Sequence, residues 1–313
     1  MSLAFVFPGQ GSQTVGMLTA FADDLAVQEV LRTADASLGE SLSSMIAQGP
    51  AESLNLTVNT QPAMLVSAYA CYAAWRAAGG PEPDAVAGHS LGEYTALTVA
   101  GALDLAQAVP LVRLRAQAMQ EAVPVGVGAM AAILGLDDAA VLQACAQARE
   151  GHPDEVVEAA NFNAPAQVVI AGHKGAVERA CANAKALGAK RALPLPVSAP
   201  FHSSLLEPAG RRLADALTRV DLRTPRIPLV NNVDVAVESD PARVADALVR
   251  QAYGPVRWVE VVAKLASMGV DRVIEFGPGK VLAGLVGRID KSLKVSAVYD
   301  PATLQAVLAE VRA

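Results

Sequence analysis

The sequence predicts an α/β fold with a mainly parallel sheet and a small antiparallel insert. Short continuous apolar runs, typical of strands that are buried on both faces, alternate with helical segments along most of the chain. In the middle of the chain the order becomes β-α-β-β-α-β, which is the order of a ferredoxin-like unit. The length of 313 residues is enough for one large domain that carries such an insert.

Four apolar runs predict the strands of the main sheet, because each is followed by glycine, proline or asparagine residues that indicate a turn. These strands are expected at residues 3–7, 86–88, 227–230 and 272–276. An apolar helix is expected directly after the second strand, over residues 93–100, and a longer amphipathic helix over residues 105–121.

The insert is predicted from four further strands and two helices, and proline and glycine residues mark both of its ends. Its strands are expected at residues 129–136, 156–162, 167–172 and 190–196. Its helices are expected at residues 138–149 and 174–187. We therefore divide the chain into an insert at residues 126–197 and a core formed by residues 1–125 and 198–313.

Composition and charge exclude several classes of protein. The chain is 52% hydrophobic and 18% charged, so it is not intrinsically disordered, and its net charge of −6 argues against a nucleic-acid binder. The longest uncharged stretch, residues 53–75, contains Asn55, Asn59 and Gln61, so no membrane span is expected. No signal peptide is expected either, because the first basic residue is Arg32. We expect a cytoplasmic protein.

Metal and redox chemistry are not expected from the sequence. Cys71, Cys145 and Cys181 lie far apart without a C-x-x-C pair, and we expect buried free thiols. No cluster of histidine, cysteine and acidic residues has metal-ligand spacing. The glycines at 9 and 11 lack the third glycine of a dinucleotide fingerprint. The sequence thus contains none of the patterns expected for a metal site or a dinucleotide site.

The segment Gly88-His89-Ser90-Leu91-Gly92 matches the pattern G-x-S-x-G between a predicted strand and a predicted helix. Two glycines allow a sharp turn that presents the serine at its tip, beside a helix N-terminus whose free N–H groups can stabilise an oxyanion. Ser90 is therefore the candidate nucleophile, with a chance turn as the alternative.

A serine nucleophile needs a base, and His202 is the best of the four histidines. His89 is expected to diverge from Ser90 at the turn and to have a structural or orienting role, and His152 and His173 are expected at the surface. His202 follows the insert and precedes a helix that we expect Ser204 and Glu207 to cap, so its imidazole should resist protonation near a helix N-terminus. A packed loop histidine is the alternative.

Arg115 is the candidate for binding a carboxylate. It lies about 60° from the centre of the apolar stripe of the helix predicted over residues 105–121, at 100° per residue. No acidic residue stands three or four positions away. We expect a half-buried guanidinium without a partner on its own helix, which suits bidentate carboxylate binding. A snorkelling arginine is the alternative, and Arg113 is expected at the surface.

Five segments in order resemble the malonyl-CoA:acyl carrier protein transacylases of bacterial type II fatty acid synthesis. They start at Phe7, Gly88, Leu114, Pro200 and Glu275 and read FPGQGSQ, GHSLGE, LR, PFH and EFGPG. The resemblance covers nearly the whole chain, from residue 3 to about residue 290. It implies a hydrolase-like core with a ferredoxin-like insert.

The resemblance also implies roles for named residues. Ser90 would be the nucleophile and His202 the base, as a dyad in which a carbonyl near Gln251 orients the histidine. The backbone N–H groups of Gln10 and Leu91 would form the oxyanion hole. Within the pocket, Arg115 would hold the malonyl carboxylate, Asn161 would line the wall, and Phe201 would disfavour α-branched substrates.

The implied reaction transfers malonyl from malonyl-CoA to the phosphopantetheine thiol of acyl carrier protein, through an ester on Ser90 and without a cofactor. The basic segment 174–191 is a candidate docking surface for the acidic carrier, with a solvated helix face as the alternative. Other readings are a serine thioesterase, the transacylase subunit of a malonate decarboxylase, and a carrier-binding module without catalysis. Intact Ser90 and His202 count against the last.

Overall fold

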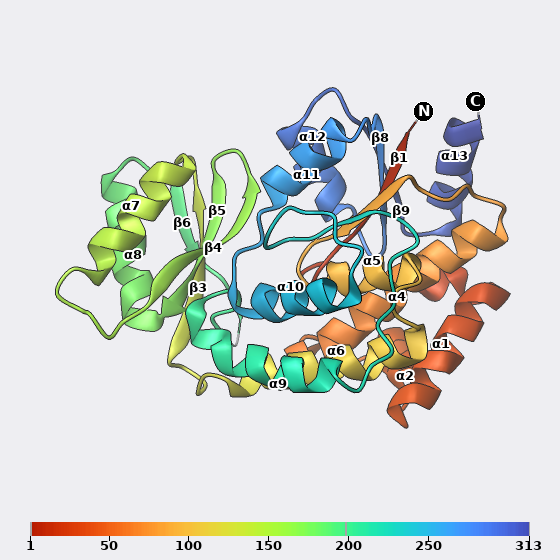
Figure 1. Ribbon diagram of the computed structural model, residues 1–313, viewed down its shortest axis with the longest axis horizontal. Helices are drawn as coiled ribbons and strands as arrows, with labels where there is room; N and C mark the ends of the chain where they lie inside the picture. The colour runs from red at the N-terminus through yellow and green to blue at the C-terminus, as the bar shows by residue number, and fades with distance from the viewer. Residues whose placement is uncertain (1, 198, 313) are drawn as a thin grey trace.

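The computed structural model describes residues 2–197 and 199–312 and consists of an α/β core joined to a smaller antiparallel unit (Figure 1). The core sheet has the order β7-β2-β1-β8-β9, and all its pairings are parallel. Its strands are β1 (Leu3–Phe7), β2 (Ala85–Gly88), β7 (Leu229–Val230), β8 (Arg272–Phe276) and β9 (Lys294–Val298). The predicted fold class is confirmed. The predicted boundary at Ser198 lies outside the described residues.

Helices cover both faces of the core sheet, as the alternation of buried side chains along β1 shows. Phe5 and Phe7 belong to the larger apolar cluster on one face, whereas Ala4 and Val6 belong to the cluster on the other. The first face is packed by α1 (Leu25–Leu38), α2 (Leu42–Gln48), α3 (Ala51–Leu54), α4 (Thr57–Ala77), α5 (Gly92–Val99), α6 (Leu105–Glu121), α9 (Glu207–Leu217), α10 (Pro241–Tyr253) and α13 (Pro301–Arg312). The second is packed by α11 (Trp258–Ser267) and α12 (Val281–Ile289).

The long helix α4 contains most of the uncharged stretch at residues 53–75, for which no membrane span was predicted. Within residues 2–197 and 199–312, no helix combines the length and the apolar character that crossing a bilayer requires.

The antiparallel unit lies at one end of the molecule (Figure 1) and has the strand order β4-β5-β3-β6. Its elements are β3 (Gly128–Leu134), α7 (Asp138–Arg149), β4 (Val157–Ala164), β5 (Gln167–His173), α8 (Lys174–Ala186) and β6 (Arg191–Pro194). One face of this sheet packs against α7 and α8. Met130 and Val169, on the other face, pack with Met119 and Phe201 of the core. The edge strand β4 is also tied to the core by hydrogen bonds between Phe162 N–H and the Val256 carbonyl and between Val256 N–H and the Ala160 carbonyl, both 2.9 Å.

Three local features differ from the sequence prediction. Strand β9 was not predicted, because it lies at the sheet edge and is half-exposed along most of its length. Strand β7 is two residues long instead of four. The predicted cap by Ser204 and Glu207 is wrong: Ser204 N and Oγ donate to the carboxylate of Glu158 at 2.8 and 3.0 Å. A 3-10 turn over Ser204–Leu206 therefore precedes α9, which begins at Glu207.

Candidate active site

The turn between β2 and α5 presents Ser90 at its tip, in a left-handed backbone conformation with a φ of 53°. Both glycines of the G-x-S-x-G pattern are required by close backbone contacts. A Cβ on Gly88 would lie 1.9 Å from the carbonyl carbon of Gly92, and a Cβ on Gly92 would meet the end of β1. The turn is thus held against two strands of the sheet, as the pattern predicts.

His202 lies beside this turn and is 4% exposed. Its Nε2 is 2.6 Å from Ser90 Oγ, and its Nδ1 is 2.9 Å from the Gln251 carbonyl oxygen and 3.2 Å from that of Gly254. Carbonyl oxygens only accept hydrogen bonds, so Nδ1 carries the proton and Nε2 is free to accept one from Ser90. The two groups that orient the imidazole on this side are main-chain carbonyls, as the family resemblance implied.

Burial is the main reason why His202 is neutral. It lowers the pKa of His202 to about 3, and the positive charge of Arg115 acts in the same direction. The lowered pKa agrees with the predicted resistance of this imidazole to protonation. A neutral imidazole in contact with the hydroxyl is ready to take its proton.

Arg115 is more buried than predicted, with only 2% of its surface exposed. Its guanidinium donates to Gln61 Oε1 at 2.5 Å, to Gln251 Oε1 at 3.0 Å and to Ser90 Oγ at 3.2 Å. It also lies over the ring of Tyr94, 5.3 Å from the centroid. The prediction of a half-buried side chain is wrong, because Arg115 is almost fully buried. The prediction that it has no partner on its own helix agrees with these contacts, since its partners are neutral groups on α4, α5, α10 and the serine turn.

The sequence patterns did not identify three buried polar residues of the site. Gln61 lines the cavity and accepts from Arg115, Asn232 accepts from the Ser90 N–H, and Glu93 accepts from Asn232 and Gln251. Gln61 extends from α4, Glu93 from the first turn of α5, and Asn232 from the turn after β7. All three are at most 2% exposed. A buried polar residue within an apolar helix was a signal that could have identified Gln61 and Glu93, since such groups need specific partners.

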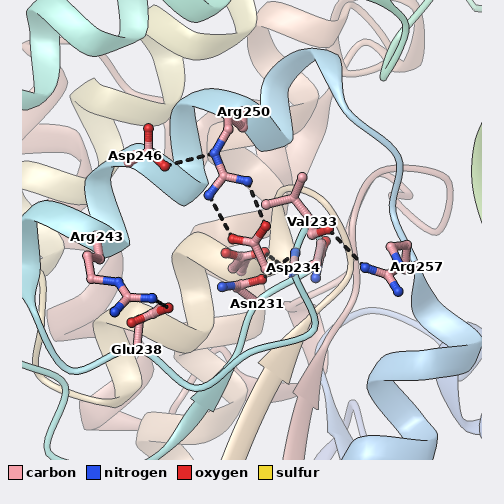
Figure 2. A network of polar contacts seen from close by, with 10 residues as sticks. Asn231, Val233, Asp234, Glu238, Arg243, Asp246, Arg250 and Arg257 are labelled. Carbon is pink, nitrogen blue, oxygen red and sulfur yellow. Dashed lines mark hydrogen bonds and ion pairs between the residues drawn. The ribbon is translucent and has the colours of Figure 1, made fainter.

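Ion pairs fix the turn after β7 to helix α10 (Figure 2). Arg250 donates to both carboxylate oxygens of Asp234 at 2.7 Å and to Asp246 at 2.8 Å. The backbone N–H of Asp234 donates to Asn231 Oδ1 at 2.8 Å. Because Gln251 follows Arg250 in α10, these contacts tie the turn that carries Asn232 to the helix end that holds His202.

A cavity of about 210 Å³ opens above the serine. It is lined by most of the predicted site residues: Gln10, Ser90, Leu91, Arg115, Asn161, Phe201 and His202. Gln251 is the exception, because its side chain lies behind Arg115 and its carbonyl behind His202. The Gln10 side chain is held by a hydrogen bond from Thr57 Oγ1 at 2.8 Å. The backbone N–H groups of Gln10 and Leu91 have no protein acceptor among the described residues, so they can receive a ligand oxygen.

The other histidines and the cysteines lie outside the dyad. His89 lines the cavity and its Nε2 is 2.7 Å from Asn163 Oδ1, which fits an orienting role. His152 is exposed as expected, whereas His173 is half-buried and accepts from Val156 N–H at 2.9 Å. The cysteines are free, and Cys181 is only half-buried. No group of three or more candidate metal ligands occurs in the part of the chain that the structure describes.

Comparison with known proteins agrees with this geometry. Residues 4–301 match the acyl transferase domain family. The malonyl CoA-acyl carrier protein transacylase of Escherichia coli K12 is 54% identical over 306 residues, which are 97% of this chain and 98% of that protein. An acyl-carrier-protein S-malonyltransferase from Burkholderia pseudomallei 1710b is 64% identical with a TM-score of 0.96, over 99% of this chain and 100% of that one.

A second similar structure contains a carrier. It is a type II PKS acyl-carrier protein in complex with its malonyl-transacylase, and the match is 48% identical with a TM-score of 0.96, over 99% of this chain and 100% of that one. The family predicted from the sequence motifs is confirmed. The chain belongs to the malonyl CoA-acyl carrier protein transacylases, within the acyl transferase domain family.

Proposed function

We propose that the protein transfers malonyl from malonyl-CoA to the phosphopantetheine thiol of acyl carrier protein through a malonyl ester on Ser90. One observation carries the proposal: Ser90 Oγ lies 2.6 Å from a neutral imidazole nitrogen of His202 and 3.2 Å from the guanidinium of Arg115. The first contact supplies a nucleophile, and the second supplies a charge for a substrate that carries its own carboxylate.

In the first half-reaction, His202 Nε2 takes the proton of Ser90 while Oγ attacks the thioester carbonyl carbon. The carbonyl oxygen becomes an oxyanion, which accepts hydrogen bonds from the N–H groups of Gln10 and Leu91, each contributing about 3 kcal/mol. When the C–S bond breaks, the imidazolium returns its proton to the CoA thiolate. The products are free CoA and the malonyl ester of Ser90.

The second half-reaction runs the same steps in reverse order. His202 takes the proton of the phosphopantetheine thiol, and the sulfur attacks the ester carbonyl of Ser90. The second oxyanion collapses, the ester bond to Ser90 breaks, and His202 protonates the serine oxygen. Because the two substrates use one site in turn, the kinetics are ping-pong.

Arg115 and Phe201 set the choice of acyl group in this scheme. A malonyl carboxylate can accept from the guanidinium, whereas an acetyl group offers the buried charge no partner. Phe201 is 6% exposed and lines the cavity next to the base, where it restricts branching at the α carbon. Asn161, placed on β4 at the cavity wall, is the third proposed pocket residue.

The acceptor is proposed to dock on the exposed cations of segment 174–191. Four of them are exposed, namely Lys174, Lys185, Lys190 and Arg191, whereas Arg179 is paired with Glu155. An acidic carrier would complement these charges, and a solvated helix face is the alternative.

We further propose that the chain divides into a core of residues 1–125 and 198–313 and an insert at residues 126–197. We also propose that the protein is cytoplasmic.

Intact-mass measurement after brief exposure to malonyl-CoA tests the function. The wild-type protein should gain one malonyl group, Ser90→Ala should gain none, and addition of holo acyl carrier protein should remove the group and malonylate the carrier. Ser203→Ala is the matched control, because Ser203 adjoins His202 but its Oγ donates to the Pro200 carbonyl at 2.7 Å. Rapid CoA release without an adduct or a malonylated carrier would instead favour a thioesterase.

A further inference from the structure

Glu93 is a buried carboxylate directly beneath the nucleophile turn, and the mechanism above gives it no role. It is 1% exposed and is not among the described residues that line the cavity. Its Oε2 accepts two hydrogen bonds, from the backbone N–H of Asn232 and from Gln251 Nε2, both at 2.9 Å. A single oxygen thus connects α5 with the turn after β7 and with the end of α10.

Through Gln251, Glu93 determines how Arg115 is held. Gln251 Nε2 donates to Glu93 Oε2 and to the Ser90 carbonyl, both at 2.9 Å. An amide has a nitrogen on one side and an oxygen on the other, so these contacts direct Gln251 Oε1 toward Arg115, 3.0 Å away. The reversed amide would place its NH₂ group against the guanidinium, donor against donor.

Through Asn232, Glu93 also supports the backbone around the serine. Asn232 Oδ1 accepts from the N–H of Ser90 at 2.7 Å, and its Nδ2 donates to the Gly88 carbonyl at 2.7 Å. These bonds hold the turn on both sides of its tip, where Ser90 has a positive φ. The carboxylate fixes the residue that makes them.

We propose that Glu93 is a positioning residue that aligns both Ser90 and Arg115, so that one carboxylate couples the nucleophile to the group that selects the acyl chain. This inference rests on the proposed function for its selectivity part. Its nucleophile part is independent of the substrate.

The charge of Glu93 strengthens these contacts, since ionised acceptors bind donors more strongly than neutral ones. The charged and titratable groups that act on it are Arg115 on α6, Asp234 in the turn after β7 and Tyr94 on its own helix. Burial raises the pKa of Glu93 to about 7, while Gln251, Asn232 and Arg115 act in the opposite direction. As the pH falls through 7, Glu93 should take up a proton and hold Asn232 and Gln251 less strongly, so the alignment of Ser90 and Arg115 should weaken. His202, with a pKa of about 3, does not titrate in this range.

The test compares Glu93→Gln, which keeps an acceptor oxygen without the charge, with Glu93→Leu, which removes both. Glu275→Gln is the matched control: Glu275 is also buried in the core, its pKa is also raised by burial to about 7, and its Oε2 accepts from Ala283 N–H at 2.7 Å at the start of α12. Two quantities are measured. One is the ratio of kcat/KM for malonyl-CoA to that for acetyl-CoA, and the other is the rate at which a fluorophosphonate labels Ser90.

We expect Glu93→Leu to lower both quantities about tenfold, because it leaves two buried donors unpaired. Glu93→Gln should lower both about threefold, because it retains the acceptor. In the wild type the ratio should fall as the pH drops through 7, whereas in Glu93→Gln it should not change with pH. Glu275→Gln should keep the wild-type ratio, labelling rate and pH profile.

A folded Glu93→Leu protein with the wild-type ratio and labelling rate would overturn the proposal. If Glu93→Leu does not fold, Glu93→Gln decides. The proposal is then overturned if Glu93→Gln has the same ratio and labelling rate as the wild type, and if the ratio of the wild-type protein does not change with pH across 7. Failure of the proposed function looks different, because the wild type would then form no malonyl adduct while fluorophosphonate labelling still tests how Glu93 positions Ser90.

Discussion

A Cβ atom on Gly92 would lie 1.9 Å from the carbonyl oxygen of Phe7. The first turn of α5 therefore rests directly on the end of β1, and both sides of the contact are backbone that cannot rotate away. We expect Gly92→Ala to lower the free energy of unfolding by about 3 kcal/mol, the upper range for overpacking in a core. Urea denaturation measures this change.

Gly284→Ala is the control for that substitution. Gly284 is also helical, in α12, but a Cβ there meets no heavy atom within 4 Å. Alanine should stabilise the helix by up to about 1 kcal/mol. Equal effects of the two variants would show that the contact with Phe7 does not constrain the turn.

Arg115→Ala should change the choice of acyl group. We expect kcat/KM for malonyl-CoA to fall about 100-fold and the relative rate with acetyl-CoA to rise, because the buried charge that pairs with the carboxylate is gone. Steady-state assays with both thioesters measure this. Arg113→Ala is the control on the same helix, since Arg113 pairs with Glu40 and does not line the cavity, although it is half-buried and not at the surface as predicted. Near wild-type malonyl transfer by Arg115→Ala would place the carboxylate elsewhere.

His202 should make the folded state less stable in acid. Its pKa falls from 6.5 to about 3 on folding, so between these values the unfolded chain binds more protons. The contribution of His202 to the free energy of unfolding therefore declines as the pH falls from 6.5 toward 3. The free energy of unfolding is measured for the wild type and for His202→Gln across this range. The wild-type value minus the variant value should decline as the pH falls. A constant difference would mean that the imidazole is not desolvated in the folded protein.

Reversing charge at the proposed docking surface should affect only the acceptor. We expect Lys190→Glu with Arg191→Glu to raise KM for acyl carrier protein about tenfold at low salt, and to leave KM for malonyl-CoA unchanged. Lys291→Glu with Lys294→Glu is the matched control, because Lys294 begins β9, at the opposite end of the sheet from the strand ends that carry the serine turn. Unchanged kinetics with both substrates would remove segment 174–191 as a docking surface.

Phe201→Ala should admit a branched acyl group. Removal of this ring from the cavity wall is expected to raise the rate with methylmalonyl-CoA relative to malonyl-CoA about tenfold. Phe162→Ala serves as the control, since Phe162 packs with the core of the insert. A competition assay with both thioesters gives the ratio, and an unchanged ratio would assign the exclusion of branched groups to another residue.

The strand order along the chain and the β-α-β-β-α-β insert were predictable because buried strands form continuous apolar runs that end at marked turns. Strand β9 could not be found in this way. It is an edge strand with Lys294 and Ser296 among its five residues, so its pairing with β8 rather than its composition makes it a strand.

At the site, Ser90 and His202 were predictable from local patterns, whereas the environment of Arg115 was not. The spacing of apolar residues along one helix predicts which side of that helix is buried, but not what packs against it. The acceptors Gln61 and Gln251 lie 54 and 136 residues from Arg115 in the sequence. Glu93 is a similar case. Its two donors come from segments that only the folded sheet and α10 bring together, so the sequence around Glu93 does not indicate them.

The contact between Ser90 and His202 spans 112 residues of sequence, with the insert in between. Strand β2 and helix α5 flank the serine, but its base comes from beyond the insert, and Asn232, which holds the serine turn, comes from still further along the chain. We expect a folding intermediate that lacks either contact to react slowly with thioesters, because its serine has neither a base nor a fixed backbone. Acylation of Ser90 should therefore report assembly of the site, and its time course during refolding would show when the last segment of the site arrives.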